Sequence, residues 1–166
     1  QAFEVLKASG AVFFQTEGRL KGCWVMPGSA FREGGGGEGE EDSKVIVRSN
    51  GTVTYVGKDI AYQFWKLGLL GRDFQYRVFS SRPQGPLWAT CAADGRSDHP
   101  SFGGATAVYN VIDVRQSYLQ KLLKQALIAA GHRDGADRSH HFSYEMVTLS
   151  HATARELGYT VPAETD

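Results

Sequence analysis

Residues 44–63 read KVIVRSNGTVTYVGKDIAYQ, and residues 111–116 read VIDVRQ. In the first stretch, the dipeptide Asn50-Gly51 favours a tight turn with positive φ angles. β-Branched and aromatic residues stand on both sides of this turn, as they do in paired strands. The stretch therefore predicts a hairpin whose second strand ends on Tyr55.

A helix is predicted directly after this hairpin, over residues 58–67. Ile60, Phe64 and Leu67 recur at helical spacing and would share one apolar face. Asp59 would lie at the start of the helix, where the helix dipole favours a carboxylate.

The second stretch predicts a strand that ends in polar residues. Residues 105–112 form a short, mostly apolar run, typical of a strand that is covered on both faces. A helix over residues 116–130 would follow it. Ligands of open parallel sheets bind beyond the carboxyl ends of the strands, so Asp113, Arg115 and Gln116 are candidate site residues.

Tyr55, Asp59 and Gln116 would supply a phenol hydroxyl, a carboxylate and an amide. This set of acceptors suits a guanidinium group, which is planar, permanently charged and forked. A carboxylate meets a guanidinium with two parallel hydrogen bonds.

In this order and setting, the motifs resemble those that form the arginine pocket of class I arginyl-tRNA synthetases. The matching residues are the turn Val47-Arg48-Ser49-Asn50-Gly51-Thr52, then Tyr55 with Asp59-Ile60-Ala61, and Val111 with Asp113, Arg115 and Gln116. The resemblance implies that Asp59 accepts the arginine guanidinium and that Tyr55 and Gln116 orient the amino acid. Asp113 and Arg115 would support the pocket as an ion pair. Without the resemblance, Asp59 reads as a helix-start carboxylate that binds backbone amides.

Residues 144–147, Tyr-Glu-Met-Val, resemble the family segment whose backbone holds the adenine ring, although Glu145 stands where the family has glycine. The implied ATP contacts are His141, Tyr144, Met146 and Val147. His140 and His141 are adjacent in a predicted strand and would point to opposite faces, which makes them poor co-ligands of a metal ion. No metal site is predicted.

Two further family signatures, "His-x-Gly-His" and a loop like "Lys-Met-Ser-Lys-Ser", do not occur in the sequence. In the family they hold the ATP phosphates, so we expect the chain alone not to aminoacylate. The first residue, Gln1, also indicates a piece of a longer catalytic domain. The intact enzyme would ligate arginine to tRNA(Arg) with ATP and Mg²⁺.

The predicted fold class is α/β, as part of a Rossmann-like parallel nucleotide-binding fold with a β-hairpin-rich connecting portion. Residues 1–43 would be the connecting portion, with an acidic glycine-rich loop. Residues 44–166 would be the C-terminal part of the class I catalytic domain, with an insertion at 74–104. The other predicted elements are a helix over 2–9, strands over 12–15, 20–26, 76–79, 87–91 and 140–149, and a helix over 151–157 that Ser150 caps.

Composition limits the possible partners. The 18 basic and 18 acidic side chains cancel, so the chain lacks the basic excess that holds nucleic-acid phosphates. A tRNA would therefore be held mainly by regions outside this chain. No apolar run approaches the ~20 residues of a membrane-spanning helix and no secretory pattern opens the chain, so we expect a cytoplasmic protein with no membrane partner. Cys23 and Cys91 match no metal spacing and are expected to be reduced thiols.

Other interpretations remain open. The glycine-rich tract at residues 30–42 could cradle a phosphate, but its acidic surroundings favour a solvated loop. The whole chain could be a non-catalytic arginine-binding or protein-interaction module derived from a synthetase. A different class I synthetase is a third possibility.

Overall fold

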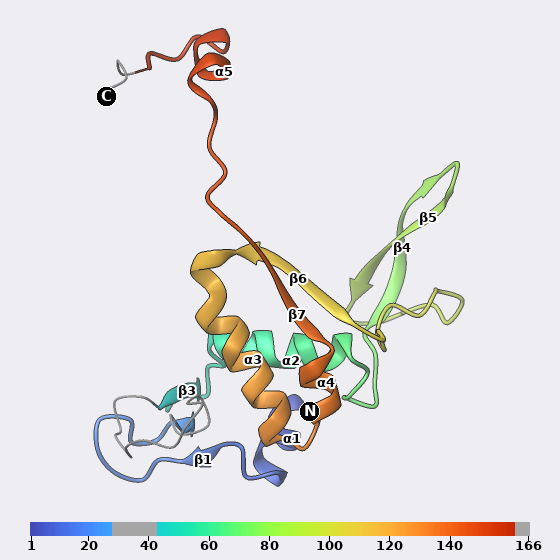
Figure 1. Cartoon of the computed structure of the whole chain (residues 1–166). Coiled ribbons are helices and arrows are strands. Elements are labelled where there is room, and N and C mark those ends of the chain that lie inside the picture. Colours follow the sequence, from blue (N-terminus) through green and yellow to red (C-terminus); the bar gives the residue numbers. More distant parts are fainter. Residues whose placement is uncertain (28–42, 162–166) are drawn as a thin grey trace.

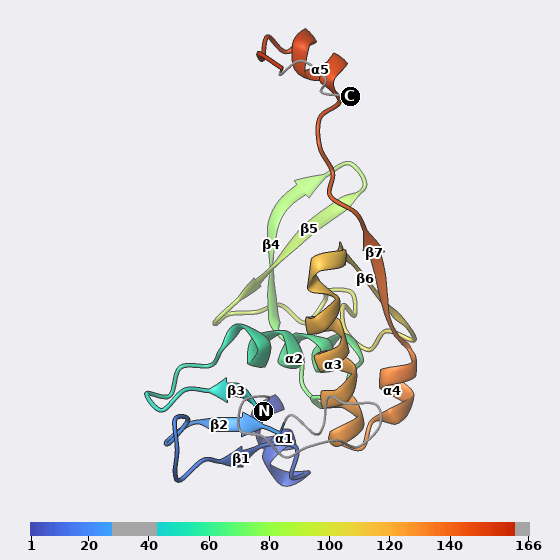
Figure 2. The same cartoon turned by 60° about the vertical axis from the view of Figure 1, so that its left-hand side comes forward.

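The computed structural model describes residues 1–27 and 43–161. The elements, in chain order, are α1 (Ala2–Ala8), β1 (Phe13–Phe14), β2 (Trp24–Met26), β3 (Lys44–Val47), α2 (Tyr55–Lys66), β4 (Gln75–Arg82), β5 (Gly85–Cys91), β6 (Val108–Asp113), the 3₁₀ helix η3 (Val114–Gln116), α3 (Ser117–Ala129), α4 (Arg133–Asp137), β7 (Ser139–Tyr144) and α5 (His151–Glu156). Helices α1 to α4 gather with β1 to β3 into one body, and the β4–β5 hairpin and the segment that carries α5 project from it (Figures 1 and 2). The predicted acidic glycine-rich loop lies outside the described residues.

The strands form three small sheets. β1, β2 and β3 make an antiparallel sheet in that order, β4 and β5 make an antiparallel hairpin, and β6 and β7 make a parallel pair. The predicted mixed α/β class is therefore confirmed. Within the described residues, β6 and β7 are the only parallel pair, so the predicted Rossmann-like sheet stays a prediction.

The core lies where α2 and α3 pack against α1 and the β1–β3 sheet. The predicted apolar face of α2 is confirmed, because Ile60, Phe64 and Leu67 are all buried. The other buried residues of this core include Leu6, Met26, Ile46, Leu123, Ala126 and Leu127. Each large apolar side chain removed from water in this way contributes about 1.5–3 kcal/mol.

The predicted turn at Asn50-Gly51 is confirmed, but only Gly51, not Asn50, has the expected positive φ angle. Gly51 has a φ angle of +82°, which a residue with a side chain rarely adopts. Its amide donates to the Arg48 carbonyl at 2.9 Å, and the Asn50 Oδ1 atom accepts from the Thr52 amide at 3.0 Å.

Helix α2 begins at Tyr55, three residues earlier than predicted. Thr54 is the N-cap, and its Oγ1 accepts a hydrogen bond from the Gly57 amide at 3.3 Å. The predicted second strand of the hairpin is therefore wrong, because after the turn only Val53 pairs, in an isolated bridge with β3. Thr54 satisfies a free amide at the start of the helix, and α2 therefore begins before a second strand can form.

The predicted order of strand and helix is confirmed for β6 and α3. The predicted burial of the strand is not. The apolar run at 105–112 was expected to be covered on both faces, and this is wrong. Tyr109 and Val111 are 64% and 66% exposed, because α2 and α3 lie on the opposite face of the β6–β7 pair. Gln116 stands at the N-cap position of α3 and makes no side-chain capping bond there.

The last predicted strand is shorter than expected, since β7 ends at Tyr144 and the chain continues to 150 without regular structure. This segment runs away from the body and ends in α5 (Figure 1). The predicted cap of that helix is confirmed, because the Ser150 Oγ accepts from the Thr153 amide at 3.1 Å.

The β4–β5 hairpin confirms the predicted pairing of two strands and extends both. Its base is tied to α2 through Asp73. One oxygen of this carboxylate accepts hydrogen bonds from the Trp65 Nε1 at 2.6 Å, the Phe74 amide at 2.7 Å and the Tyr76 hydroxyl at 2.8 Å. Among the described residues, no helix is both long and apolar enough to cross a membrane.

Candidate functional site

A cleft of about 300 Å³ lies between α2, β6 and α3. Phenols, amides and two opposite charges dominate its lining, which is formed by Tyr55, Asp59, Tyr62, Gln63, Lys66, Tyr109, Asn110, Val111, Ile112, Leu119, Gln120 and Leu123. The α2 residues share one side of that helix because they recur three or four positions apart.

Asp59 is the chemically unusual residue of this cleft. It lies in the second turn of α2, not at its start as predicted. The side chain as a whole is half-buried, but its Oδ2 atom is buried and accepts no hydrogen bond. Burial raises the pKa of this carboxyl, and the hydroxyl of Tyr55 and the charge of Lys66 act in the opposite direction. A buried acceptor left without a donor costs about 1–3 kcal/mol, which a bound donor would recover.

Lys66 brings the opposite charge into the same cleft. Its Nζ donates to the Asn110 Oδ1 at 2.8 Å and lies 4.5 Å from the centre of the Tyr62 ring. Burial lowers the pKa of this ammonium, while the charge of Asp59 acts to raise it. Lys66 is therefore held by β6 and by an aromatic face.

A chain of buried amides fixes the walls of the cleft. The Gln63 Nε2 donates to the Ser139 Oγ at 2.7 Å, and the Asn110 Nδ2 donates to the Gln120 Oε1 at 2.9 Å and to the Gln63 Oε1 at 3.3 Å. These bonds join α2, α3, β6 and β7. In a buried site such a network sets one arrangement of the elements, because each broken bond leaves a polar group unpaired.

These amides and Lys66 were not predicted as site residues from the sequence. A signal was present, because Gln63 interrupts the apolar face of α2 next to Phe64, and Gln120 does the same beside Leu119 in α3. A polar residue on a buried helix face needs a partner across the interface.

The structure brings together two of the three predicted arginine contacts. Tyr55 and Asp59 both line the cleft, one helical turn apart. Gln116 is not among the lining residues, since η3 places it past the end of β6.

The predicted ion pair between Asp113 and Arg115 is confirmed. The Arg115 Nε and Nη2 donate to the two carboxylate oxygens at 2.8 and 3.0 Å, and the Arg115 amide also donates to Asp113. These hydrogen bonds lower the pKa of Asp113 and raise that of Arg115. Tyr144 lies opposite Asp113 in the parallel pair, so both strands bring polar residues to the same edge.

The four predicted ATP contacts are spread along β7 and the segment after it. The His141 Nε2 lies 3.0 Å from the Ile112 carbonyl, and Tyr144 ends the strand. Met146 and Val147 are 66% and 83% exposed beyond it. Their contact with a nucleotide stays a prediction.

Among the potential metal ligands and the cysteines, in the part of the chain that the structure describes, no metal site is found. No group of three His, Cys, Asp or Glu side chains there is arranged to hold a metal ion. Cys23 and Cys91 are both free thiols.

Comparisons with known proteins relate this chain to one group of enzymes. No protein-family model matches the chain. An arginine–tRNA ligase of Deinococcus radiodurans is 41% identical over 154 residues, which cover 92% of this chain and 24% of that protein. One from Thermus thermophilus is 40% identical over 149 residues, which cover 90% of this chain and 24% of that protein.

A solved structure agrees with these relatives. The arginyl-tRNA synthetase of Thermus thermophilus matches 87% of this chain and 23% of its own with a TM-score of 0.69 and 36% identity. The chain thus spans about a quarter of the length of the curated relatives it matches. Over about nine tenths of its own length, it is homologous to arginine–tRNA ligases.

Proposed function

We propose that this chain is the part of an arginine–tRNA ligase that holds the arginine side chain, with Asp59 as the acceptor of the guanidinium. The buried Oδ2 atom of Asp59, which lacks a donor, is the observation that supports this assignment. A guanidinium presents donors in a fixed fork and can satisfy both oxygens of one carboxylate.

The rest of the cleft suits the same ligand. The phenol rings of Tyr55 and Tyr62 lie on the α2 side of it, and a guanidinium stacks well on aromatic faces. Tyr55 would orient the amino acid from the mouth of the cleft. Gln116 lies outside the cleft, so we expect its replacement to weaken arginine binding less than replacement of Asp59.

We also propose that the intact protein has the arginine–tRNA ligase activity named for its relatives. In that enzyme the arginine carboxylate would attack the α-phosphate of ATP, and the arginyl group would then pass to tRNA(Arg). Arg115, the cation at the carboxyl edge of β6, is already paired with Asp113. The ATP phosphates, Mg²⁺ and most of the tRNA would therefore be held by regions outside this chain.

The domain organisation is part of the same proposal. Residues 1–43 would connect to the catalytic region, residues 44–166 would form its C-terminal part, and residues 74–104 would be an insertion. The β4–β5 hairpin would lie within that insertion.

Calorimetric titration of the chain with arginine, lysine and citrulline tests the assignment. Citrulline keeps the shape of arginine but lacks its charge, and Asp59→Asn keeps the shape of the acceptor but lacks its charge. We expect each change to weaken binding roughly 10- to 100-fold, as loss of a charge-assisted hydrogen bond does.

The matched control is Asp137→Asn, which removes an exposed carboxylate at the end of α4 and should leave arginine binding unchanged. Equal affinities for arginine and citrulline would refute the role of Asp59. So would full arginine binding by a folded Asp59→Asn variant.

A second candidate is the non-catalytic arginine-binding or protein-interaction module. The exposed apolar residues Tyr109, Val111 and Phe142 on one face of β6 and β7 favour it, because such a face suits a protein partner. The genomic reading frame separates the two candidates. Flanking signature motifs would support the ligase, and a frame that is limited to these residues would support the module.

A further inference from the structure

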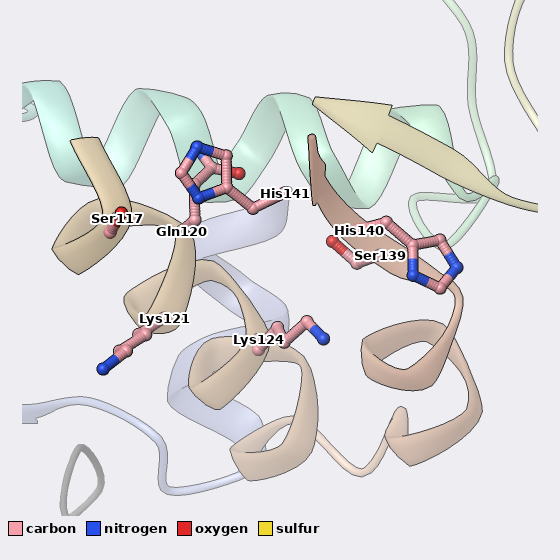
Figure 3. A pocket seen from close by; sticks show the side chains of 7 residues that line it. All are labelled: Ser117, Gln120, Lys121, Lys124, Ser139, His140 and His141. Carbon is pink, nitrogen blue, oxygen red and sulfur yellow. The ribbon is translucent and has the colours of Figure 1, made fainter. Parts of the chain in front are cut away.

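A pocket of about 430 Å³ lies between α3 and β7, outside the Asp59 cleft. Its lining is cationic and polar, and consists of Ser117, Gln120, Lys121, Lys124, Ser139, His140 and His141 (Figure 3). Among the residues that the structure describes, no carboxylate lines it. A concave surface with an excess of positive charge attracts an anion.

The two lysines of this pocket have no carboxylate partner among the described residues. Lys121 and Lys124 lie three residues apart on α3, where like charges repel. In the ranges 1–27 and 43–161, neither forms an ion pair with a carboxylate. Lys124 extends from α3 toward β7, whereas Lys121 points away at the rim (Figure 3). An anion beside Lys124 would supply the missing charge.

Ser139 adds a second observation on the other wall. Its side chain is only 3% exposed, and its Oγ accepts a hydrogen bond from the Gln63 Nε2 at 2.7 Å. The Ser139 hydroxyl proton has no acceptor among the described residues. A buried hydroxyl ordinarily donates as well as accepts, so this proton is available for an oxygen in the pocket.

We propose that the α3–β7 pocket binds a phosphate group, with Lys124 as its main cation, Lys121 at the rim and Ser139 as a hydroxyl donor. A phosphate suits the pocket better than a single carboxylate does, because it carries more charge and several strong acceptor oxygens. The group can come from a free polyphosphate or from the backbone of an RNA.

An NMR titration of the whole chain tests the site with two probes, sodium tripolyphosphate and a short RNA duplex. The expected result is a set of amide shifts confined to residues 117–124 and 139–141. Lys124→Gln should weaken the binding about two- to five-fold, as removal of one charge near the surface does. Lys124→Arg should restore it. For RNA, Lys124→Gln should also lower the salt slope of binding by about one.

The matched control is Lys21→Gln, which removes an exposed lysine outside the pocket. Shifts with tripolyphosphate identify a free phosphate as the source, and shifts with the duplex alone identify an RNA backbone; either supports the site. The proposal is overturned if neither probe shifts these amides, or if Lys21→Gln weakens binding as much as Lys124→Gln. Arginine titration reports on a separate cleft, so failure there leaves this test intact.

Discussion

Asp59, the proposed acceptor of arginine, also affects the stability of the unliganded chain. Because burial raises its pKa above the ordinary value of 3.8, the folded chain binds this proton more tightly than the unfolded chain does. The free energy of unfolding therefore falls as pH rises from the ordinary value through the raised one, and the loss persists at neutral pH.

Asp59→Asn should raise the melting temperature at pH 7 by about 2–4 °C, because it removes a buried charge without a donor. The gain should shrink as the pH is lowered toward 3.8, where the wild-type carboxyl becomes protonated. Differential scanning calorimetry at both pH values checks this, with Asp137→Asn as the control. A variant that melts lower than wild type at neutral pH would contradict the proposed cost.

Tyr76 offers a second residue-level measurement. Burial and the hydrogen bond to Asp73 raise the pKa of its hydroxyl from 10.0 to about 12. Its unfolded form loses the proton first, so the free energy of unfolding falls as pH rises between these two values.

In a titration followed at 295 nm, Tyr76 should be among the last phenols to ionise, and Tyr76→Phe should remove that late phase. Circular dichroism at each pH shows whether the chain stays folded. An unchanged upper end of the curve in the variant would rule out the raised pKa.

At the scale of elements, the contact between α2 and β3 depends on a glycine. A Cβ atom at Gly57 would lie 2.9 Å from both the Ile46 carbonyl oxygen and the Val53 Cγ1. Helix and strand approach this closely only because no side chain stands between them.

Gly57→Ala should therefore destabilise the fold by about 1–3 kcal/mol through overpacking, although alanine favours helices. Urea unfolding measures the change, and Lys58→Ala at the neighbouring exposed position should stay within about 0.5 kcal/mol of wild type. A more stable Gly57→Ala protein would show that β3 can move away.

The sequence predicted most elements but misplaced those whose limits depend on tertiary contacts. The Asn50-Gly51 turn and the apolar face of α2 follow from local rules and were predicted correctly. The start of α2 was not predicted correctly, because the residues around Thr54 were compatible with both a strand and a capped helix. The exposed face of β6 was not predicted either, since an apolar run does not show which side its neighbours cover.

The candidate site shows the same division. Tyr55 and Asp59 were predicted together from the family motif, although Tyr55 was expected at the end of a strand and both in fact lie on α2. Lys66 and Asn110 were missed because they meet across two elements that are far apart in sequence. Gln116 was assigned to the cleft from the family pattern, and η3 carries it past the edge in this structure.

For the whole molecule, the uncovered side of the β6–β7 pair is the main liability. Tyr109, Val111 and Phe142 leave an apolar surface in water, and both outer edges of the pair are unpaired in the described residues. Such a surface promotes association between copies.

We expect the chain to self-associate as its concentration rises. The double variant Val111→Thr, Phe142→Thr should need a roughly ten-fold higher concentration or more to associate, because it loses apolar area. Size-exclusion chromatography with light scattering measures it. Replacement of the exposed Leu157 on the projecting C-terminal segment by Thr serves as the control. Identical behaviour of the double variant and wild type would place the contact elsewhere.

Residues 145–161 lead away from the body, as both views show (Figures 1 and 2). Tyr55 and Asp59, the proposed arginine contacts, lie on α2 within the body, whereas Met146 and Val147, the predicted ATP contacts, lie on this extended segment. Under these assignments, cleavage of the chain after Tyr144 should abolish the adenine contact and leave guanidinium binding intact.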